Sequence, residues 1–448
     1  MLHLMRLATM LAALALSASP ALTQARGERA RPDALEEFIA RAVEASPRLR
    51  AARARADAAQ AQVAPAGARP DPMLMVGVQN LPVRDPRFTD GMTMKMVGIS
   101  QTLVLGGKLS LARSAAGHEV EAAEADVDAA ALELKRDVQT AWYEIAYAER
   151  ALDIVTQSQT VLLELARATE LRYRVSNDGG LQDVVRARIE ATRLGEEASA
   201  LREARQAALA RFNALLDRPT DTPLDSVAFP ERVRQAAVAD APDEIRFASV
   251  TLGSRVADSP LPPLSELQAR AVRDNPSLRS REAMLRAQRS RARLAGRSHV
   301  PDMDVALEYG QRDGMPDMIS ATVSIPLPLQ RRRVQDQFVL SARAELAARE
   351  AEHAAEANRV RADVAQLYGD LERDRAQLAL LVKAVLPPAR VAIEAALAGF
   401  RSGRVDLASV LGAQVALFEY ETTYNRTLTS FATTLAALEA MVGGEVLP

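Results

Sequence analysis

The sequence predicts a mainly α-helical protein with a small β-barrel contribution, built as a tandem repeat. Of its 448 residues, 86 are alanine, with only 1 Trp, 7 Tyr and 9 Phe, and this composition is typical of long helices packed closely side by side. Apolar residues recur at heptad spacing in two long stretches, which indicates coiled-coil seams. A pair of short strand-like runs precedes each seam.

Composition excludes several classes of protein. The chain contains no cysteine, which excludes a disulfide scaffold, a thiolate metal site, a cysteine nucleophile and a lipid-anchored cysteine. With 56 basic and 58 acidic residues, the net charge gives no reason to expect nucleic-acid binding. The 4 histidines lack zinc-ligand spacing, and the sequence has no phosphate loop or nucleophile elbow. We therefore expect neither an enzyme nor a cofactor.

Residues 1–25 are typical of an export signal. Arg6 precedes an apolar stretch over residues 7–18, and cleavage is predicted after Ala25, with Ala21 as the alternative. This stretch is too short for a permanent transmembrane helix, and no later run reaches about 18 apolar residues. An exported protein without such a helix is periplasmic, secreted or located in the outer membrane.

The tandem repeat is visible in the register of the two seams. One seam runs through Leu134 and Val138, and the second follows it at a constant offset of 226 residues, so that Val138 matches Val364. Upstream, residues 44–50 (EASPRLR) match residues 273–279 (RDNPSLR) at an offset of 229. Small changes of offset between helices are what loop insertions produce.

Each copy is predicted to contain a helix, two strands, a long helix, a turn and a last helix. For the first repeat, residues 26–217, we expect helices at 33–64, 108–173 and 181–216 and strands at 73–80 and 92–105. For the second repeat, residues 263–448, we expect helices at 264–297, 331–398 and 405–441 and strands at 303–311 and 317–328. Residues 218–262 are rich in proline and form a connecting segment.

The predicted elements require assembly. Helices of this length span about 100 Å at 1.5 Å per residue, so one chain cannot bury both faces of them. Four strands leave unpaired edges unless several chains close a barrel. Three chains would supply twelve strands, enough for a water-filled lumen, and strands of about 9–11 residues cross a bilayer.

Basic residues follow the second strand of each copy. Lys108 follows the first pair of strands, and Arg331, Arg332 and Arg333 follow the second. In a barrel these side chains would lie level with lipid headgroups at the membrane interface. The alternative is a solvated helix start.

Methionines are concentrated in the first pair of strands, at Met73, Met75, Met92, Met94 and Met96. The last three share one strand face by period-2 geometry. A cluster of thioethers suits Cu(I) or Ag(I), so these residues form a candidate metal site. The alternative is ordinary apolar filling that faces lipid.

The order of elements resembles the TolC family of outer-membrane channel proteins. The runs VSNDGGLQDVVRA (175–187) and FRSGRVDLASVLGAQ (400–414) are similar to the helix–helix tips of this family, and PDPMLMVGVQNLP (70–82) resembles its heavy-metal efflux branch. The resemblance implies a homotrimer with a 12-stranded outer-membrane β-barrel and a periplasmic α-helical barrel.

In function, the resemblance implies a passive exit duct for heavy-metal cations (copper and silver, or cobalt, zinc and cadmium) or for drugs. Its expected partners are a periplasmic adaptor protein, an inner-membrane RND pump and outer-membrane lipid. One alternative is the outer-membrane conduit of a type I protein secretion system. A second alternative is a soluble periplasmic coiled-coil scaffold.

The resemblance also places adaptor contacts and a channel entrance at the two tips. The contact candidates are Arg174, Gly179, Leu181, Arg401, Gly403, Val405 and Leu407. Leu181 and Leu407 are expected to be exposed and to make contact, whereas the glycines have a second interpretation as turn formers. Asp183 and Asp406 are candidates for an acidic entrance ring, with helix N-capping as the alternative. The family pattern D-V-L-D-A is replaced by SVLGA over residues 409–413, so both acidic positions of that pattern are missing.

Overall fold

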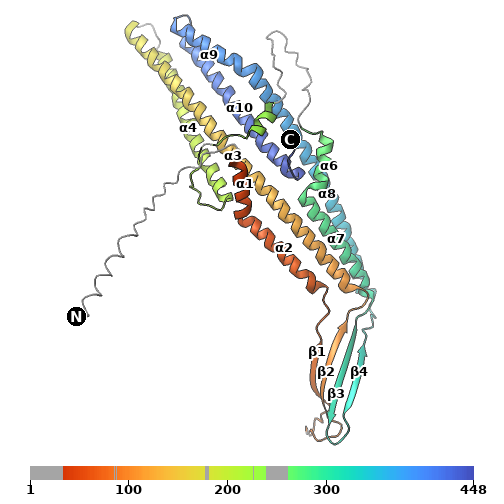
Figure 1. Ribbon diagram of the computed structural model, residues 1–448. Helices are drawn as coiled ribbons and strands as arrows, with labels where there is room; N and C mark the ends of the chain where they lie inside the picture. The colour runs from red at the N-terminus through yellow and green to blue at the C-terminus, as the bar shows by residue number, and fades with distance from the viewer. Residues whose placement is uncertain are drawn as a thin grey trace, which may run out of the picture.

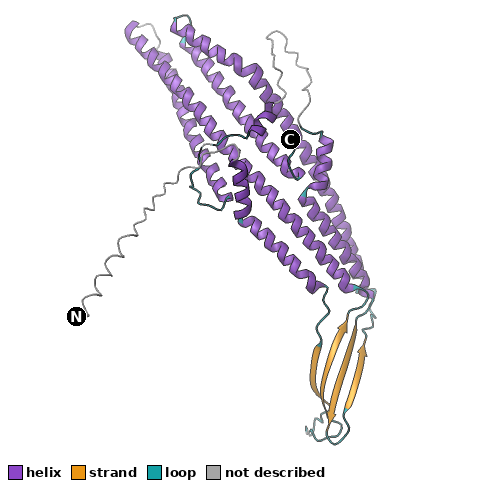
Figure 2. Cartoon of the chain, viewed as in Figure 1, coloured by secondary structure: helices purple, strands orange, loops and turns teal. Residues whose placement is uncertain are grey.

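The computed structural model describes an elongated helical bundle that ends in a small sheet (Figure 1). The described residues are 34–84, 86, 88–176, 181–225, 227–238 and 261–447; the predicted signal, residues 1–25, lies outside them. Helices dominate, and the strands lie together at one end (Figure 2). The prediction of a mainly helical chain with a small sheet is therefore confirmed.

The same order of elements occurs twice, in the sequence halves before and after the short helix α5 (Glu231–Val238). The first half contains α1 (Ala34–Ala45), α2 (Pro47–Ala66), β1 (Met73–Gln79), β2 (Met94–Leu103), α3 (Lys108–Ser176) and α4 (Leu181–Leu215). The second half contains α6 (Leu264–Asp274), α7 (Pro276–Gly296), η1 (Arg297–His299), β3 (Met303–Arg312), β4 (Met318–Ser324), α8 (Gln335–Leu380), η2 (Leu381–Val385), α9 (Leu386–Arg401) and α10 (Leu407–Val442).

The first predicted helix of each half is in fact two helices, and the break explains the matched sequence motif. Ser46 caps α2 by accepting a hydrogen bond from the Leu49 amide at 3.5 Å, and Asn275 caps α7 by accepting one from Leu278 at 3.1 Å. In both helices the next residue is a proline at the first position, where its missing N–H costs nothing. The repeated motif is therefore a helix end followed at once by a new helix start.

Asn275→Ala is expected to lower the stability more than the equivalent Ser46→Ala. Besides capping α7, the Asn275 amide donates a hydrogen bond to the Met441 carbonyl at 2.8 Å, in the last turn of α10. Loss of the cap and of this buried bond should together cost about 2 kcal/mol, against about 0.5–1 kcal/mol for Ser46→Ala. Thermal unfolding of the two variants measures the difference, and equal shifts in Tm would refute the second role of Asn275.

The long helix of the second half is interrupted, unlike α3. The sequence predicts one helix over 331–398, but α8 begins at Gln335, and a π-helical turn, η2, separates it from α9. Pro387 and Pro388 follow this turn. A proline lacks an N–H and clashes with the carbonyl four residues earlier, so the turn before these prolines takes up one extra residue as a π-bulge.

The stretch Gln335–Arg401 also contains an 18-residue window with a mean hydropathy of 1.5, enough to cross a membrane by length and composition alone. The sequence interpretation expected no such stretch. Its apolar side chains Leu380 and Val391 are exposed on the single chain. A single stretch of this kind is weak evidence for a membrane span, because a face that packs against another protein surface has the same composition.

The main core joins α1, α3 and α4 of the first half to α6, α8 and α10 of the second half. Trp142 is buried there between Phe38 and Phe212, with ring centroids 5.8 and 5.9 Å away. Its indole nitrogen donates a hydrogen bond to the Ala228 carbonyl at 2.9 Å, which fixes the connecting segment to the bundle. A second core lies among α3, α4, α9 and α10 and includes Leu162, Phe400 and Leu407.

The four strands form one antiparallel sheet in the order β1-β2-β3-β4. One rung of the ladder joins Val76, Val97, Tyr309 and Ile319. The pairing of β2 with β3 joins the two halves of the chain. The predicted strand 317–328 ends at Ser324, because Pro326 and Pro328 cannot donate ladder hydrogen bonds. β1 and β4 are the outermost strands, and each has an unpaired edge.

Candidate functional site

The register of the sheet defines two faces of different chemistry. Successive residues of a strand point to opposite faces, and paired residues of neighbouring strands point to the same face. We call the face that carries Val97 the outer face and the face that carries Met96 the inner face. Along β2 the inner-face residues from Met94 to Ser100 are buried or half-buried, whereas Lys95, Val97 and Ile99 are exposed.

The outer face is largely apolar, with Lys95, Gln101 and Gln311 as its polar residues. Its members on the edge strands include Val76, 77% exposed, and Ile319, 74% exposed. The other large exposed apolar side chains of this face are Leu74, Val78, Val97, Ile99, Leu307, Tyr309 and Val323. Exposed apolar surface of this extent indicates contact with a membrane or with another protein.

The inner face is polar apart from its methionines. Serine and threonine side chains on it are those of Ser100, Thr102, Ser320, Thr322 and Ser324, and Asp304 and Glu308 supply carboxylates. Alternation between an apolar face and a polar face along each strand is the pattern of a transmembrane β-barrel, in which the polar face lines the lumen.

Four of the five predicted methionines lie on the inner face, and the fifth does not belong to the sheet. Met73, Met75, Met94 and Met96 share that face through the pairing of β1 with β2. Met92 is wrongly predicted as a strand residue: it lies in the turn before β2, where its amide donates to the Asp90 carboxylate at 2.8 Å. Sequence reasoning missed Met318, which only the pairing of β4 with β3 brings to this face.

The basic residues at the junction of sheet and helices are in two different situations. The Lys108 ammonium forms an ion pair with the Asp302 carboxylate at 2.8 Å, so it links the start of α3 to the second half of the chain. Asp302 also accepts a hydrogen bond from the Leu105 amide at 3.1 Å. Arg331, Arg332 and Arg333 lie exposed in the turn before α8. Of these candidates, the three arginines are the more accessible to a lipid headgroup.

The tip between α9 and α10 is a tight turn with few exposed apolar groups. Gly403 has φ +71°, which favours glycine. A Cβ on Gly399 would lie 2.4 Å from a Val405 methyl group, so glycine allows Val405 to pack against the helix. Leu407 is only 2% exposed and belongs to the core. The expectation that Leu407 is exposed at the tip is therefore wrong.

Asp406 caps α10. Its carboxylate accepts hydrogen bonds from the Ser409 amide at 3.1 Å and from the Ser409 hydroxyl. These bonds hold the pKa of Asp406 below its usual value, so the carboxylate is ionised at neutral pH. The alternative interpretation of Asp406, helix N-capping, is therefore confirmed. The exposed side chains of this tip include Arg401 and Arg404, and the sequence interpretation had not selected Arg404.

The other tip is described only in part. Gly179 and the side chains of Arg174 and Leu181 lie outside the described residues. Asp183 lies half-buried in the first turn of α4, where a negative charge is favourable.

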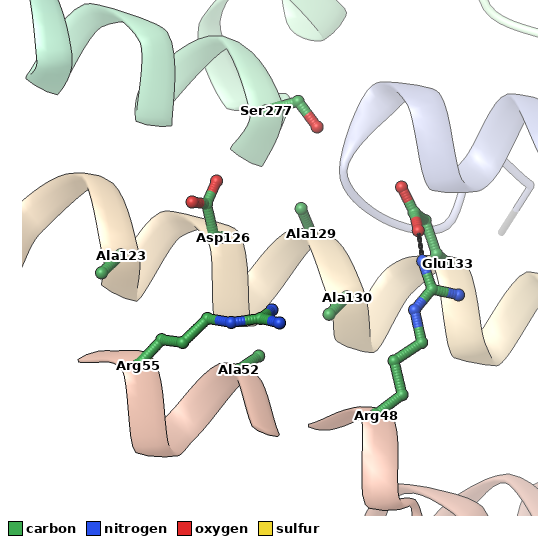
Figure 3. Close-up of a pocket in the computed structure, with 9 residues that line it drawn as sticks. All are labelled: Arg48, Ala52, Arg55, Ala123, Asp126, Ala129, Ala130, Glu133 and Ser277. Carbon is green, nitrogen blue, oxygen red and sulfur yellow. Dashed lines mark hydrogen bonds and ion pairs between the residues drawn. The ribbon is translucent and has the colours of Figure 1, made fainter. Parts of the chain in front are cut away.

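The described part of the helical bundle carries open grooves on its surface. The groove drawn in Figure 3, about 320 Å³ in volume, lies between α2, α3 and α7 and is lined by alanines and by charges of both signs. Arg48 and Glu133 form an ion pair there. Among the residues that the structure describes, no three His, Asp or Glu side chains gather closely enough to hold a metal ion.

A long helical bundle joined to a sheet with one apolar and one polar face is the architecture expected of a membrane channel protein. The chain belongs to the outer membrane efflux protein family, whose model matches residues 38–217 and 267–444. The protein is therefore an outer-membrane efflux channel, and its resemblance to TolC-family channels is confirmed.

Known proteins resemble the chain over nearly its whole length. The cobalt-zinc-cadmium resistance protein CzcC of Cupriavidus metallidurans is 25% identical over 403 residues, which are 89% of this chain and 87% of CzcC. The solved structure of VceC from Vibrio cholerae has a TM-score of 0.73 at 19% identity, covering 92% of this chain and 97% of VceC. The open-state structure of MtrE from Neisseria gonorrhoeae has a TM-score of 0.71 at 20% identity, covering 92% of this chain and 89% of MtrE.

Proposed function

We propose that three copies of the chain form one duct, with a 12-stranded β-barrel in the outer membrane and a helical barrel in the periplasm. The open edges of β1 and β4 support this proposal, because a sheet of four strands closes only with strands from other chains. The apolar outer face would then contact lipid, and the inner face would line the lumen. Residues 1–25 would direct export.

Exposed apolar residues on the long helices support the same assembly. Leu380 and Val391 lie beside the π-helical turn with their side chains exposed. In a trimer they would pack against a neighbouring copy, which accounts for an apolar window in a helix that lies outside the membrane.

We further propose that the duct is the passive exit of a tripartite efflux system for heavy-metal cations. A periplasmic adaptor and an inner-membrane RND pump would deliver the cargo and supply the energy. The observation that carries the cargo is the similarity to the cobalt-zinc-cadmium resistance protein over 89% of this chain.

Cell fractionation combined with a tolerance assay tests this proposal. The full chain should be recovered in the outer membrane as a heat-labile trimer that conducts ions in lipid bilayers. Deleting its gene should lower the tolerance of the host to cobalt, zinc or cadmium. Recovery in the soluble periplasm without detergent would instead indicate a coiled-coil scaffold. If the deletion strain instead stopped releasing a protein into the medium while its metal tolerance stayed the same, the chain would be a type I secretion conduit.

The exposed tip arginines are proposed to contact the adaptor. Replacing Arg401 and Arg404 with alanine should weaken adaptor binding at least about tenfold, because two such residues at an interface commonly contribute about 1–2 kcal/mol. The trimer should keep its Tm, since both side chains are exposed. Surface plasmon resonance with the purified adaptor measures the change. An Arg332→Ala variant, altered at the opposite end of the molecule, is the control and should bind the adaptor as the original protein does. Unchanged affinity of the Arg401 and Arg404 variant would show that other residues make the contact.

A further inference from the structure

We propose that the inner face of the sheet carries a thioether site for Cu(I) and Ag(I), formed by Met94, Met96 and Met318 around Gly310. This inference rests on the proposed function, because it places the inner face in the lumen of the duct. It adds to the divalent cargo proposed above a second class of cation that this lumen would bind, namely soft monovalent cations.

The strand register brings the three methionines together. Met96 of β2 pairs with Gly310 of β3, and Gly310 pairs with Met318 of β4. Because neighbouring strands lie about 4.8 Å apart, Met96 and Met318 flank a position that has no side chain of its own. A Cβ built on Gly310 would lie 3.3 Å from the Met94 sulfur. The third thioether therefore lies over the same glycine.

The cluster is accessible and has free space beside it. Met94 and Met96 are half-buried, whereas Met318 is exposed. On the other side of Met96, its partner in β1 is Gly77, and a Cβ there would meet no atom within 4 Å. Gly77 thus leaves room on one side of Met96 for a cation and for movement of the flexible thioethers, whereas the space over Gly310 holds the Met94 side chain.

Further thioethers continue along the same face. Met75 and Met73 occupy the next two rungs toward the helices, paired with Gly98 and Ser100. Rungs of one face are about 7 Å apart, so sulfur atoms occur on four successive rungs. The rung of Gly310 lies near the end of the sheet that is furthest from the helices (Figure 1). An exported cation would meet this cluster shortly before release.

Simple apolar filling does not account for this distribution. Of the six methionines in β1 to β4, five lie on the polar inner face, and only Met303 lies on the apolar outer face. The outer face uses valine, isoleucine and leucine instead. Methionine chosen merely as an apolar residue would be expected on the face that contacts lipid.

The chemistry of the site selects the cation. Neutral thioethers are soft ligands that bind Cu(I) in preference to hard divalent ions, and Ag(I) has the same d¹⁰ character. Glu308, whose side chain lies over Gly98 on the inner face, adds a negative charge one rung away. Arg312 is the partner of Met94 in β3. Its Nε and Nη2 atoms donate hydrogen bonds to the Pro316 carbonyl at 2.9 and 2.6 Å.

Silver binding to the purified full-length trimer tests the proposal. Silver nitrate in a chloride-free buffer is the probe, and bound metal is measured by equilibrium dialysis. The test variant replaces Met94, Met96 and Met318 with leucine, which nearly conserves side-chain volume. The control variant is Met303→Leu on the outer face. We expect the test variant to bind Ag(I) at least about tenfold more weakly, and the control to bind as tightly as the original protein.

Three outcomes separate this proposal from the proposed function. A conducting trimer whose silver affinity is unchanged by the triple replacement would overturn the thioether site and leave the duct intact. Equal loss of affinity in the Met303→Leu control would also overturn it. If the chain forms no membrane trimer, both proposals fail. Zn²⁺ serves as the comparison ion, and its binding should not respond to the triple replacement.

Discussion

Ile319→Arg is expected to prevent stable insertion of the trimer, whereas Ser320→Arg is expected to be tolerated. These neighbours in β4 lie at the same depth but on opposite faces of the sheet. A positive charge on the lipid face of a barrel costs about 2–4 kcal/mol near the bilayer midplane, and each trimer would carry three. On the inner face, arginine at position 320 would lie opposite Glu308, where its charge is favourable.

The measurement is the amount of heat-labile trimer in outer-membrane fractions. We expect Ile319→Arg to reduce it severalfold and Ser320→Arg to leave it nearly unchanged while altering the ion selectivity of the conductance. The reverse order would show that the assignment of the two faces is inverted. Equal loss in both variants would indicate that the edge strand tolerates no long side chain.

Trp142→Ala is expected to destabilise the helical region by about 3–5 kcal/mol, the usual cost of deleting a buried aromatic side chain. The ring fills the space between Phe38 and Phe212, and these residues come from α1 and α4. Its hydrogen bond to the Ala228 carbonyl also fixes the connecting segment. Thermal unfolding followed by circular dichroism suits this variant, because the change removes the only tryptophan.

Trp142→Phe separates packing from hydrogen bonding. It keeps an aromatic ring but leaves the Ala228 carbonyl without its donor, which should cost about 1–3 kcal/mol. Proteolysis near residues 219–230 should increase in this variant before the bundle unfolds. If Trp142→Phe is as unstable as Trp142→Ala, the hydrogen bond rather than the ring contacts dominates at this position.

The sequence predicted the elements that depend on local patterns. The heptad seam through Val138 and the equivalent seam through Val364 are buried, and α3 spans Lys108–Ser176, close to the range that its spacing indicates. The four strands lie within three or four residues of their predicted ends, because glycine and proline bound them.

Two errors of the sequence interpretation have different causes. Periodicity alone predicted one helix at the start of each half, although a capping residue followed by proline, at Ser46 and Asn275, is the local signal of a new helix start. Leu407 was expected at the surface because it adjoins a turn, but the packing of α10 against α3 and α9 buries it.

The methionine cluster required the register between strands distant in sequence. Met318 belongs to a different half of the chain from Met94 and Met96, and only the pairing through Gly310 joins them. Pattern counting within the first pair of strands therefore found most of the thioethers but not their arrangement. It also included Met92, because the strand starts two residues later than predicted.

The open edges of β1 and β4 also constrain the order of folding. In a single chain before membrane insertion, these edges and the apolar outer face would be open to unwanted pairing with other strands. Helical hairpins with many local contacts form faster than a sheet that joins β2 to β3 across some 200 residues. We expect the helical bundle to form first and the sheet to mature last.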